Sequence, residues 1–350
     1  MKAQLERCLE DLESRIDEAE EEALWAQWRE FTDGHFTGDL FCPQRTTPNP
    51  ARVEWPTVTV TQALASFEAM VLQQLSGASE TLAAGGGAIL NIRANYGTPI
   101  IPSLFGVEIF YMSEESNTLP ASRPLPRQAI QRAIETGVPN LHHSLGGQAL
   151  ATGASFIELL RAYPKIARHV HIYHPDTQGP MDLCEMLWGS GIFVDSYAQP
   201  ELIHALLEVV TDTYVAYLRA WEQIVPWRPD GVETHWGLLH RGHILLRDDS
   251  AMNFSPAMYE EFFVPYETRL LGEFGGGAIH FCGRGDHFVP AATAMEGMFA
   301  LNVSQPHLND MEVIFRHTVD QGIPLIGFSR EAAEQALAAG RDLQGRVQVG

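Results

Sequence analysis

The stretch Gly275-Gly276-Gly277-Ala278-Ile279-His280-Phe281-Cys282-Gly283 indicates how this chain folds. The glycine triplet is expected to end a helix and to turn the chain into a short apolar strand. Because side chains two residues apart on a strand point the same way, the His280 imidazole and the Cys282 thiol would project together from the end of that strand. In parallel barrels the chemistry is found at the C-terminal ends of the strands. The stretch therefore predicts a barrel strand that carries half of a metal site.

The amino-acid composition restricts the possible binding partners of the protein more than it restricts its fold. With 350 residues, 45% of them hydrophobic, the chain can bury a large core, and we favour one barrel domain with an added arm over two smaller domains. A net charge of -21 would repel nucleic acid and anionic membranes. No run of about 18 apolar residues occurs, the charged N-terminus does not resemble a cleaved signal, and the cysteines show no paired spacing. We expect a cytoplasmic protein with reduced thiols and a small-molecule substrate.

Residues 1 to about 31 form a distinct amphipathic piece. Its apolar residues recur at helical spacing among many acidic ones: Leu5, Leu9, Leu12, Ile16, Ala19, Ala23 and Trp28. The pattern leaves open whether this stripe packs on its own domain or on a second copy in a homodimer. Prolines deny regular structure to residues 36–56. We expect residues 1–45 to form a helical arm and linker, and residues 46–350 to form the barrel.

Beyond the linker, short apolar runs alternate with longer helical patterns, which is typical of parallel strands joined by crossover helices. The expected strands are 88–93, 107–111, 169–173, 231–236, 278–282, 298–303 and 323–328, with an eighth near 138–142. The clearest helices are 200–222, 255–274 and 330–339. The predicted fold class is α/β, a closed (β/α)8 TIM barrel with an N-terminal helical arm.

Four stretches give the chain a resemblance to a known family. They are Gly179-Pro180-Met181-Asp182-Leu183-Cys184-Glu185, Asp249-Ser250-Ala251-Met252-Asn253-Phe254-Ser255-Pro256, the run from His280 to Gly283, and Leu301-Asn302-Val303-Ser304-Gln305-Pro306. Over most of residues 85–330 the chain resembles the uroporphyrinogen decarboxylase superfamily, in particular its zinc-dependent methyltransferase branch with the methylcobalamin:coenzyme M methyltransferases. The resemblance implies a (β/α)8 barrel and a zinc bound by the His and Cys of the His-x-Cys motif and by a later Cys.

Two departures from the family pattern matter. The decarboxylases' Met-Arg-Gln-Ala-Gly-Arg stretch is missing from the first 100 residues, which argues against haem synthesis. No cysteine follows Cys282, so another residue must complete the metal shell. Glu233 and His235 are two apart on the expected preceding strand, and catalytic zinc accepts mixed His, Cys and carboxylate ligands. His307 is a further candidate ligand. An isolated His-x-Cys pair is more often a core histidine beside a buried thiol.

Other polar residues are placed to shape the pocket. The candidate substrate-binding residues are Arg93, Tyr96, Gln178, Arg247 and Arg284. A guanidinium would suit a substrate carboxylate or sulfonate, although a salt bridge at the barrel rim is the commoner role of such arginines. The candidate acid, base or outer-sphere residues are Asp249, Asp286 and His287.

The function implied by the resemblance is methyl transfer between a small donor or methylcorrinoid protein and a thiol or other acceptor. Zinc would lower the pKa of a bound thiol. The chain has no corrinoid-binding signature, so a corrinoid would be supplied by a partner protein. One alternative is a metal-independent decarboxylase or lyase of a small carboxylated substrate, with Arg93, Arg247 and Arg284 as clamps. The other is a barrel that binds a ligand or docks a corrinoid protein without catalysis.

Overall fold

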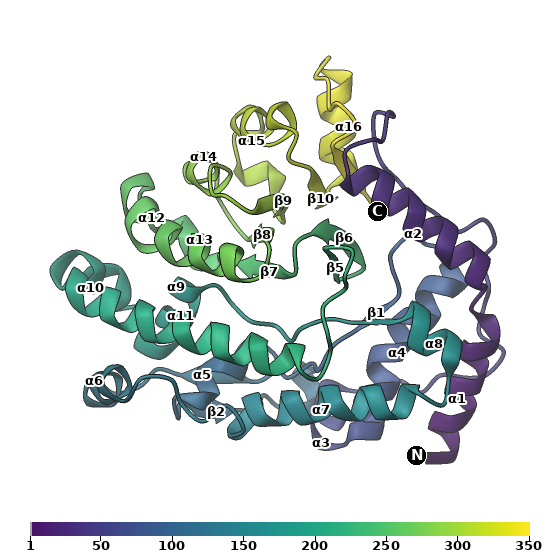
Figure 1. Ribbon diagram of the computed structural model, residues 1–350, viewed down its shortest axis with the longest axis horizontal. Helices are drawn as coiled ribbons and strands as arrows, with labels where there is room; N and C mark the ends of the chain where they lie inside the picture. Colours follow the sequence, from purple (N-terminus) through teal and green to yellow (C-terminus); the bar gives the residue numbers. More distant parts are fainter. Residues whose placement is uncertain (1) are drawn as a thin grey trace.

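A parallel sheet lies at the centre of the molecule, and helices surround it (Figure 1). The computed structural model describes residues 2–350. Five parallel strands are ordered β11-β10-β9-β8-β7, and their bounds are β7 Ile244–Arg247, β8 Gly277–Phe281, β9 Met298–Val303, β10 Leu325–Phe328 and β11 Val347–Val349. A second parallel pair consists of β1 (Asn91–Ile92) and β4 (His171–Ile172). The expected α/β class is confirmed.

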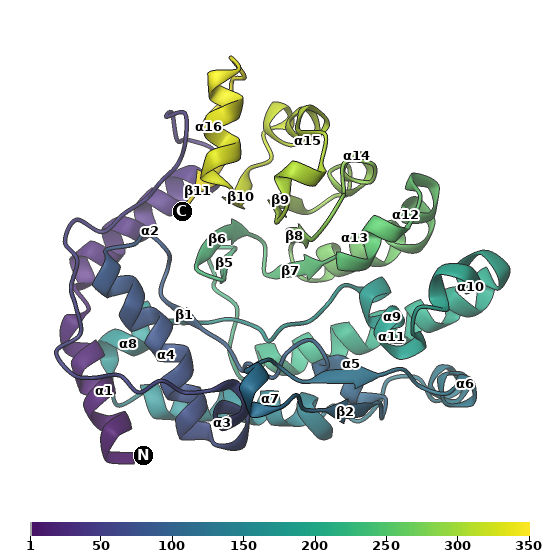
Figure 2. The same ribbon diagram turned by 180° about the vertical axis from the view of Figure 1, so that it is seen from behind.

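Contacts at the two edges of the five-stranded sheet continue the ring of strands. At one edge Phe41 pairs in parallel with Gln348 of β11. At the other edge the Gly179 amide, in the segment that follows β4, donates to the Arg247 carbonyl at 2.9 Å. The central segments therefore follow one another around the molecule as in the expected (β/α)8 barrel, with sparse hydrogen bonding between β7 and the chain after β4. Figure 2 shows the same arrangement from behind.

Helices form the outer layer. Their bounds are α1 Lys2–Arg15, α2 Glu18–Thr32, α3 Val60–Ala65, α4 Phe67–Ala84, α5 Ile100–Leu104, α6 Arg127–Thr136, α7 Ser144–Leu160, α8 Pro164–His169, α9 Pro180–Trp188, α10 Ile192–Ala198, α11 Pro200–Glu222, α12 Pro256–Phe262, α13 Val264–Glu273, α14 Val289–Ala292, α15 Met311–His317 and α16 Arg330–Ala338. The helices expected at 200–222 and 330–339 are confirmed, whereas the one expected at 255–274 is divided at Phe263. Among residues 2–350, no helix is both long and apolar enough to cross a bilayer.

The glycine triplet acts as the sequence predicts. Helix α13 ends at Glu273, and β8 begins at Gly277. Gly276 has φ +91, a left-handed conformation that glycine adopts readily. A Cβ on Gly277 would lie 2.0 Å from the Ile244 carbonyl oxygen, so only glycine lets β8 start this close to β7. The triplet thus allows β8 to begin in close contact with Ile244 of β7.

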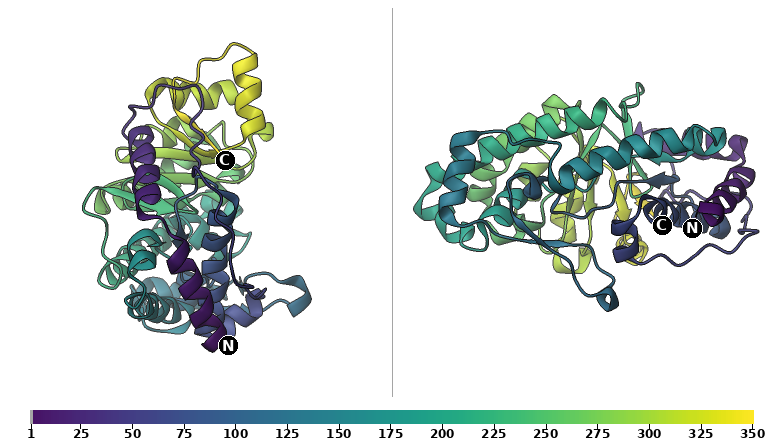
Figure 3. Two further views of the ribbon diagram at one scale, coloured as in Figure 1. Left: turned by 90° about the vertical axis from the view of Figure 1, so that its right-hand side faces the viewer. Right: turned by 90° about the horizontal axis from the view of Figure 1, so that it is seen from below.

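Helices α1 and α2 lie along one side of the molecule (Figure 3). Leu5, Leu9 and Leu12 of α1 belong to the same buried cluster as the residues of the central sheet. Arg15 is buried and donates to Ser79 Oγ at 2.6 Å and to Asp11 Oδ2 at 3.2 Å. The apolar stripe of α1 is therefore covered by the chain's own core.

Three of the expected barrel strands need correction. Residues 107–111 contain β2 (Glu108–Phe110), which pairs antiparallel with β3 (Ala121–Arg123), and residues 138–142 hold no strand. Residues 231–236 contain β5 (Val232–His235), which pairs antiparallel with β6 (Leu238–Arg241). Trp236 and Gly237 between them have φ +53 and +79, and a two-residue turn with positive φ values closes a hairpin. The parallel sheet instead contains β7 and β11, which were not expected, and Phe41 pairs with its β11 edge.

Candidate metal centre

Three potential metal ligands converge at the C-terminal ends of β7 and β8. His280 is on β8, Cys282 directly follows it, and Asp249 opens the 3₁₀ helix η2 (Asp249–Asn253) two residues after β7. His280 Nε2 lies 3.6 Å from Asp249 Oδ1 and 3.5 Å from Cys282 Sγ. Within residues 2–350 this is the only cluster of three or more His, Cys, Asp or Glu side chains close enough to share an ion.

The spacing of these donors fits zinc. Ligands about 2.0–2.3 Å from a tetrahedral zinc ion lie roughly 3.5 Å from one another. The contacts from His280 Nε2 to the sulfur and to the carboxylate oxygen match this separation before any ion is added. One imidazole, one thiolate and one carboxylate also form a donor set that zinc accepts, with the fourth position left for a substrate.

Asn302 on β9 determines the tautomer of His280. The two residues are partners in the β8–β9 register, and His280 Nδ1 lies 2.6 Å from Asn302 Oδ1. The Asn302 amide nitrogen donates to the Ile326 carbonyl at 2.6 Å, so its oxygen must face the imidazole. Nδ1 therefore carries the proton, and Nε2 presents its lone pair to Asp249 and Cys282. Such an outer hydrogen bond is a common support of metal-binding histidines.

Protonation of the two strand residues follows from burial. Burial lowers the pKa of His280, which keeps the imidazole neutral near pH 7 as metal binding requires. Burial also raises the pKa of the Cys282 thiol, and the Asp249 carboxylate raises it further, while the hydrogen bond to Ser304 acts in the opposite direction. Without a cation the cysteine is therefore a thiol, and a bound ion must displace its proton.

Asp249 is held in place by two donors. The Cys282 backbone amide donates to Asp249 Oδ1 at 3.0 Å, and the Gln178 side-chain amide donates to Oδ2 at 3.2 Å. Gln178, which the sequence assigns to the substrate, thus contacts a potential ligand instead. Asp249 itself, expected as an acid or base, is the third member of the ligand cluster.

Arg93 and Arg247 share one carboxylate beside the cluster. Arg93 Nη1 and Arg247 Nη2 lie 2.9 Å and 2.5 Å from the oxygens of Asp176. The Arg247 guanidinium also lies 4.9 Å from the Trp236 ring centre, and that ring meets His280 edge-on at 5.0 Å. Two guanidinium groups against one carboxylate leave excess positive charge at this wall.

The remaining predicted pocket residues lie outside the ligand cluster. Tyr96 is buried and its hydroxyl bonds Thr152 Oγ1 at 2.8 Å. The Arg284 side chain is 66% exposed and pairs with Asp286 at 2.9 Å. Asp286 also accepts the Asp310 amide at 2.9 Å, and His287 Nε2 donates to the Phe254 carbonyl at 2.9 Å. The contacts of Arg284, Asp286 and His287 stabilise the conformation of the loop after β8.

Glu233 and His235, which the sequence suggests as metal ligands, are not part of the cluster in the structure. Their strand β5 pairs with β6, whereas the neighbour of β8 on that side is β7. His235 Nδ1 donates to His240 Nε2 at 2.7 Å, since His240 Nδ1 donates its own proton to the Arg241 carbonyl at 2.9 Å. Burial raises the pKa of Glu233 to about 8. His307 is exposed in another 3₁₀ turn and is likewise outside the cluster.

Sequence reasoning missed two features of this site. Asp249 was not expected among the potential ligands, because β7 was not expected and the residue therefore had no place at a strand end. Asn302 was noted only within a family-like stretch. Its signal was positional, because it lies on the strand that follows His280 and in register with it.

A cavity of about 490 Å³ adjoins the candidate metal centre. Its walls come from β3, α9, η2 and neighbouring loops, and the lining residues are Thr98, Ala121, Ser122, Pro124, Gln178, Asp182, Glu185, Met186, Gly189, Asp249, Ser250 and Asn253. Asp249 belongs both to this lining and to the ligand cluster, so the cavity and the candidate metal centre share this residue. Burial, reinforced by Asp248 and Asp249, raises the pKa of Asp182 well above its usual range.

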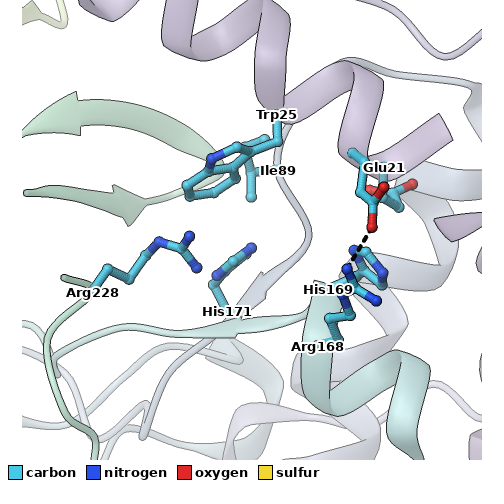
Figure 4. A pocket seen from close by; sticks show the side chains of 8 residues that line it. Glu21, Trp25, Ile89, Arg168, His169, His171 and Arg228 are labelled. Atoms are coloured by element: carbon cyan, nitrogen blue, oxygen red, sulfur yellow. Dashed lines mark hydrogen bonds and ion pairs between the residues drawn. The ribbon is translucent and has the colours of Figure 1, made fainter. Parts of the chain in front are cut away.

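A second cavity, of about 300 Å³, lies between α2 and the start of β4 (Figure 4). Trp25 stacks on His171 at 4.8 Å, and the Arg228 guanidinium lies 4.1 Å from the Trp25 ring centre. Arg168 pairs with Glu22 at 2.6 Å, and Arg228 pairs with Asp230 at 3.2 Å. The two guanidinium groups are thus already paired, and the cavity lies near the opposite ends of the strands from Cys282.

Comparisons with known proteins agree with the sequence motifs. No family model matches the chain. A uroporphyrinogen decarboxylase of Xanthomonas axonopodis pv. citri (strain 306) is 30% identical over 217 residues, which cover 58% of this chain and 53% of the relative. One from Xanthomonas campestris pv. campestris (strain B100) is 29% identical over 185 residues, which cover 51% and 45%. The chain spans about half the length of the curated relatives it matches.

Among solved structures, a methyltransferase from Methanosarcina mazei has a similar fold. The TM-score is 0.63 at 15% sequence identity, and the match covers 93% of this chain and 92% of that one. At this identity the match concerns the fold. With sequence similarity to the decarboxylases and the fold of this methyltransferase, the resemblance of the chain to the uroporphyrinogen decarboxylase superfamily is confirmed.

Proposed function

We propose that this protein is a zinc-dependent methyltransferase that moves a methyl group between a small donor or a methylcorrinoid protein and a thiol or other small acceptor. The observation that carries the proposal is the convergence of Asp249, His280 and Cys282 with the Nε2 lone pair facing the other two donors. The fold shared with a methyltransferase supports it. A corrinoid would be supplied by a partner protein.

Each residue of the site has a defined task in this proposal. Asp249, His280 and Cys282 would hold the ion, and bound zinc supplies a Lewis acid that favours the anionic form of a thiol or oxygen ligand near neutral pH. Asn302 keeps the proton on His280 Nδ1, and Gln178 fixes the Asp249 carboxylate. The Cys282 thiol would lose its proton on binding an ion. Trp236 packs edge-on against the His280 ring, with 5.0 Å between the ring centres.

A decarboxylase is the second candidate, because the curated relatives are uroporphyrinogen decarboxylases and because Arg93 and Arg247 flank the site. In that case the two guanidinium groups would bind a substrate carboxylate and the His280–Cys282 pair would have no catalytic task. This candidate predicts that activity persists after Cys282→Ala and without zinc.

Methyl transfer from free methylcobalamin to a panel of thiols tests the proposal. Loss of the methyl–cobalt absorbance and formation of the thioether are followed for the wild type, for Cys282→Ala and for the control Cys42→Ala. Cys42 is a free cysteine outside the ligand cluster. We expect turnover by the wild type and Cys42→Ala, and a loss of at least about a hundredfold in Cys282→Ala. Carbon dioxide release from carboxylated substrates by all three proteins would favour the decarboxylase, and inactivity with every substrate would favour a binding protein.

A further inference from the structure

The cavity beside the candidate metal centre is lined by acidic groups. Asp182, Glu185 and Asp249 contribute carboxyl groups to its wall, and none of the Lys, Arg or His side chains among residues 2–350 lines it. An anionic substrate group placed here would face the carboxylates of Glu185 and Asp249 in partly buried surroundings, where charges are only weakly screened, and the protonated Asp182 adds no positive charge. The lining therefore disfavours the sulfonate or carboxylate end of a substrate.

Two acceptor atoms in this wall have no hydrogen-bond donor. Asp182 is 4% exposed, and its Oδ1 accepts the Ser250 amide at 2.9 Å while its Oδ2 has no partner. Gln178 donates its amide nitrogen to Asp249, so its oxygen is the free atom, and that oxygen is also buried without a partner. Buried polar atoms in folded proteins are normally paired. The Gln178 oxygen therefore needs a donor, which a bound molecule can supply. Asp182 is protonated without a bound cation, because burial raises its pKa, and a cation in the cavity would favour its ionised form, which accepts hydrogen bonds.

A second metal ion does not fit these atoms. Among the described residues, only the cluster with His280 and Cys282 places three suitable donors within reach of one ion. A protonated amine fits better, because an ammonium group offers several N–H donors and a positive charge to acceptors that are too dispersed to share one ion. A volume of about 490 Å³ is adequate for a small organic molecule.

We propose that this cavity binds a protonated amine on the substrate, with Asp182, Glu185 and the Gln178 oxygen as its acceptors. The assignment of that amine to the substrate rests on the proposed methyltransferase function, whereas the cation preference of the cavity does not. Because Asp249 belongs to both sites, one short molecule can reach the cavity with its ammonium group and the candidate metal centre with another atom. The amine belongs either to the thiol acceptor or to a methylated ammonium donor.

Two sets of matched probes test this proposal. The first set comprises cysteamine, 2-mercaptoethanol and 2-mercaptoethanesulfonate, which share a thiol and differ in charge. Calorimetric titration measures the affinity of zinc-loaded protein for each of them. The second set comprises ethanolammonium and ethylene glycol, which contain no thiol. Their binding to metal-free protein is measured by ligand-observed NMR, so this set does not depend on zinc. A comparison of dimethylammonium with dimethyl ether then tests whether the cavity prefers a methylated ammonium compound as the methyl donor. The variants are Asp182→Asn and Glu185→Gln, with Glu201→Gln on the exposed start of α11 as a charge-matched control.

We expect cysteamine to bind roughly tenfold more tightly than 2-mercaptoethanol, and the sulfonate more weakly than both, as for a charge-assisted hydrogen bond. Either cavity variant should reduce that preference to about threefold or less, and Glu201→Gln should retain it. Glu185→Gln keeps the test decisive if the buried Asp182→Asn fails to fold. A preference for ethanolammonium that depends on Glu185 supports the cavity even if zinc is never bound. Equal binding of the charged and neutral probes by the wild type, or a preference unchanged in Glu185→Gln, overturns the inference even if the methyltransferase proposal holds.

Discussion

At the scale of single residues, the account depends on which nitrogen of His280 carries the proton. Asn302 fixes this by accepting from Nδ1 while it donates to Ile326. We predict that Asn302→Ala lowers zinc affinity by roughly 10–100-fold, the usual effect of losing such an outer contact, and that Asn302→Asp keeps more of it because the acceptor remains. Competition with a chromophoric chelator measures both. Equal affinities in Asn302→Ala and the wild type would contradict the assigned tautomer.

The raised pKa of Cys282 makes zinc binding depend on pH. Since the thiol is protonated near neutrality, each bound ion displaces one proton, and apparent zinc affinity should rise by up to about tenfold per pH unit between about pH 7 and 8.5. The lowered pKa of His280 means that the imidazole adds no further proton in this range. Titrations in buffers of different ionisation enthalpy count the released protons. Zinc binding without proton release would exclude Cys282 as a ligand.

The sequence identifies the His280–Cys282 pair because strand alternation alone places both side chains on one side. Their third partner could not be identified in the same way. Asp249 reaches them across the β7–β8 junction, and this contact depends on which strand neighbours β8. Glu233 and His235 have the same spacing as the pair, so spacing could not exclude them. In the structure their hydrogen bonds and strand pairing lie elsewhere, and they are not part of the ligand cluster.

At the scale of secondary structure, the β5–β6 hairpin carries a carboxyl group that favours its protonated form. Burial raises the pKa of Glu233 to about 8, above the value near 4.3 expected in the unfolded chain. The folded protein therefore holds an extra proton between these values, and stability falls as pH rises from about 4.5 to 8, by at most about 1.4 kcal/mol per pH unit.

Glu233→Gln should flatten this part of the pH dependence. Urea unfolding at several pH values measures the effect, with exposed Glu201→Gln as control. The variant should also bind zinc like the wild type, because Glu233 is outside the ligand cluster. An unchanged slope would show that Glu233 is ionised in the folded state, and loss of zinc would restore it as a ligand.

The α1 helix is anchored by a buried ion pair. Arg15 contacts Asp11 and Ser79, and both partners of the pair have almost no exposed side-chain surface. Arg15→Met should lower the free energy of unfolding by about 3–5 kcal/mol, because it leaves the Asp11 carboxylate buried without its cation. Exposed Arg7→Met should change it little. A loss below about 1 kcal/mol, or a separate early transition, would indicate that α1 unfolds independently of the core.

Several elements could be predicted and others could not, for physical reasons. Continuous apolar runs predict β8, β9 and β10, and proline at the first turn predicts α11 and α12. Periodicity gives no pairing partner, so the strand before Trp236 was expected in the barrel although its turn makes a hairpin. Short β7 was missed because Ile244–Arg247 lies between two turns and ends in a charged residue.

At the scale of the whole molecule, the acidic chain has two neighbouring regions of opposite electrostatic potential beside the candidate metal centre. The net charge is -21, yet Arg93 and Arg247 concentrate positive charge on one side of the candidate metal centre while the neighbouring cavity is acidic. A scaffold shared with decarboxylases and a methyltransferase does not determine the reaction, because loops and strand ends carry the chemistry. The order of the central strands matters because it brings Asp249, His280 and Cys282 together.

The zinc content of protein purified without chelator tests the central claim most directly. Elemental analysis would compare the wild type, Cys282→Ala, His280→Ala, Asp249→Ala and the control Glu233→Gln. The account predicts about one zinc ion per chain in the wild type and in Glu233→Gln, and roughly a tenth of that or less in the three ligand variants. Negligible zinc in the wild type even after incubation with the ion, or full zinc in all three ligand variants, would contradict it.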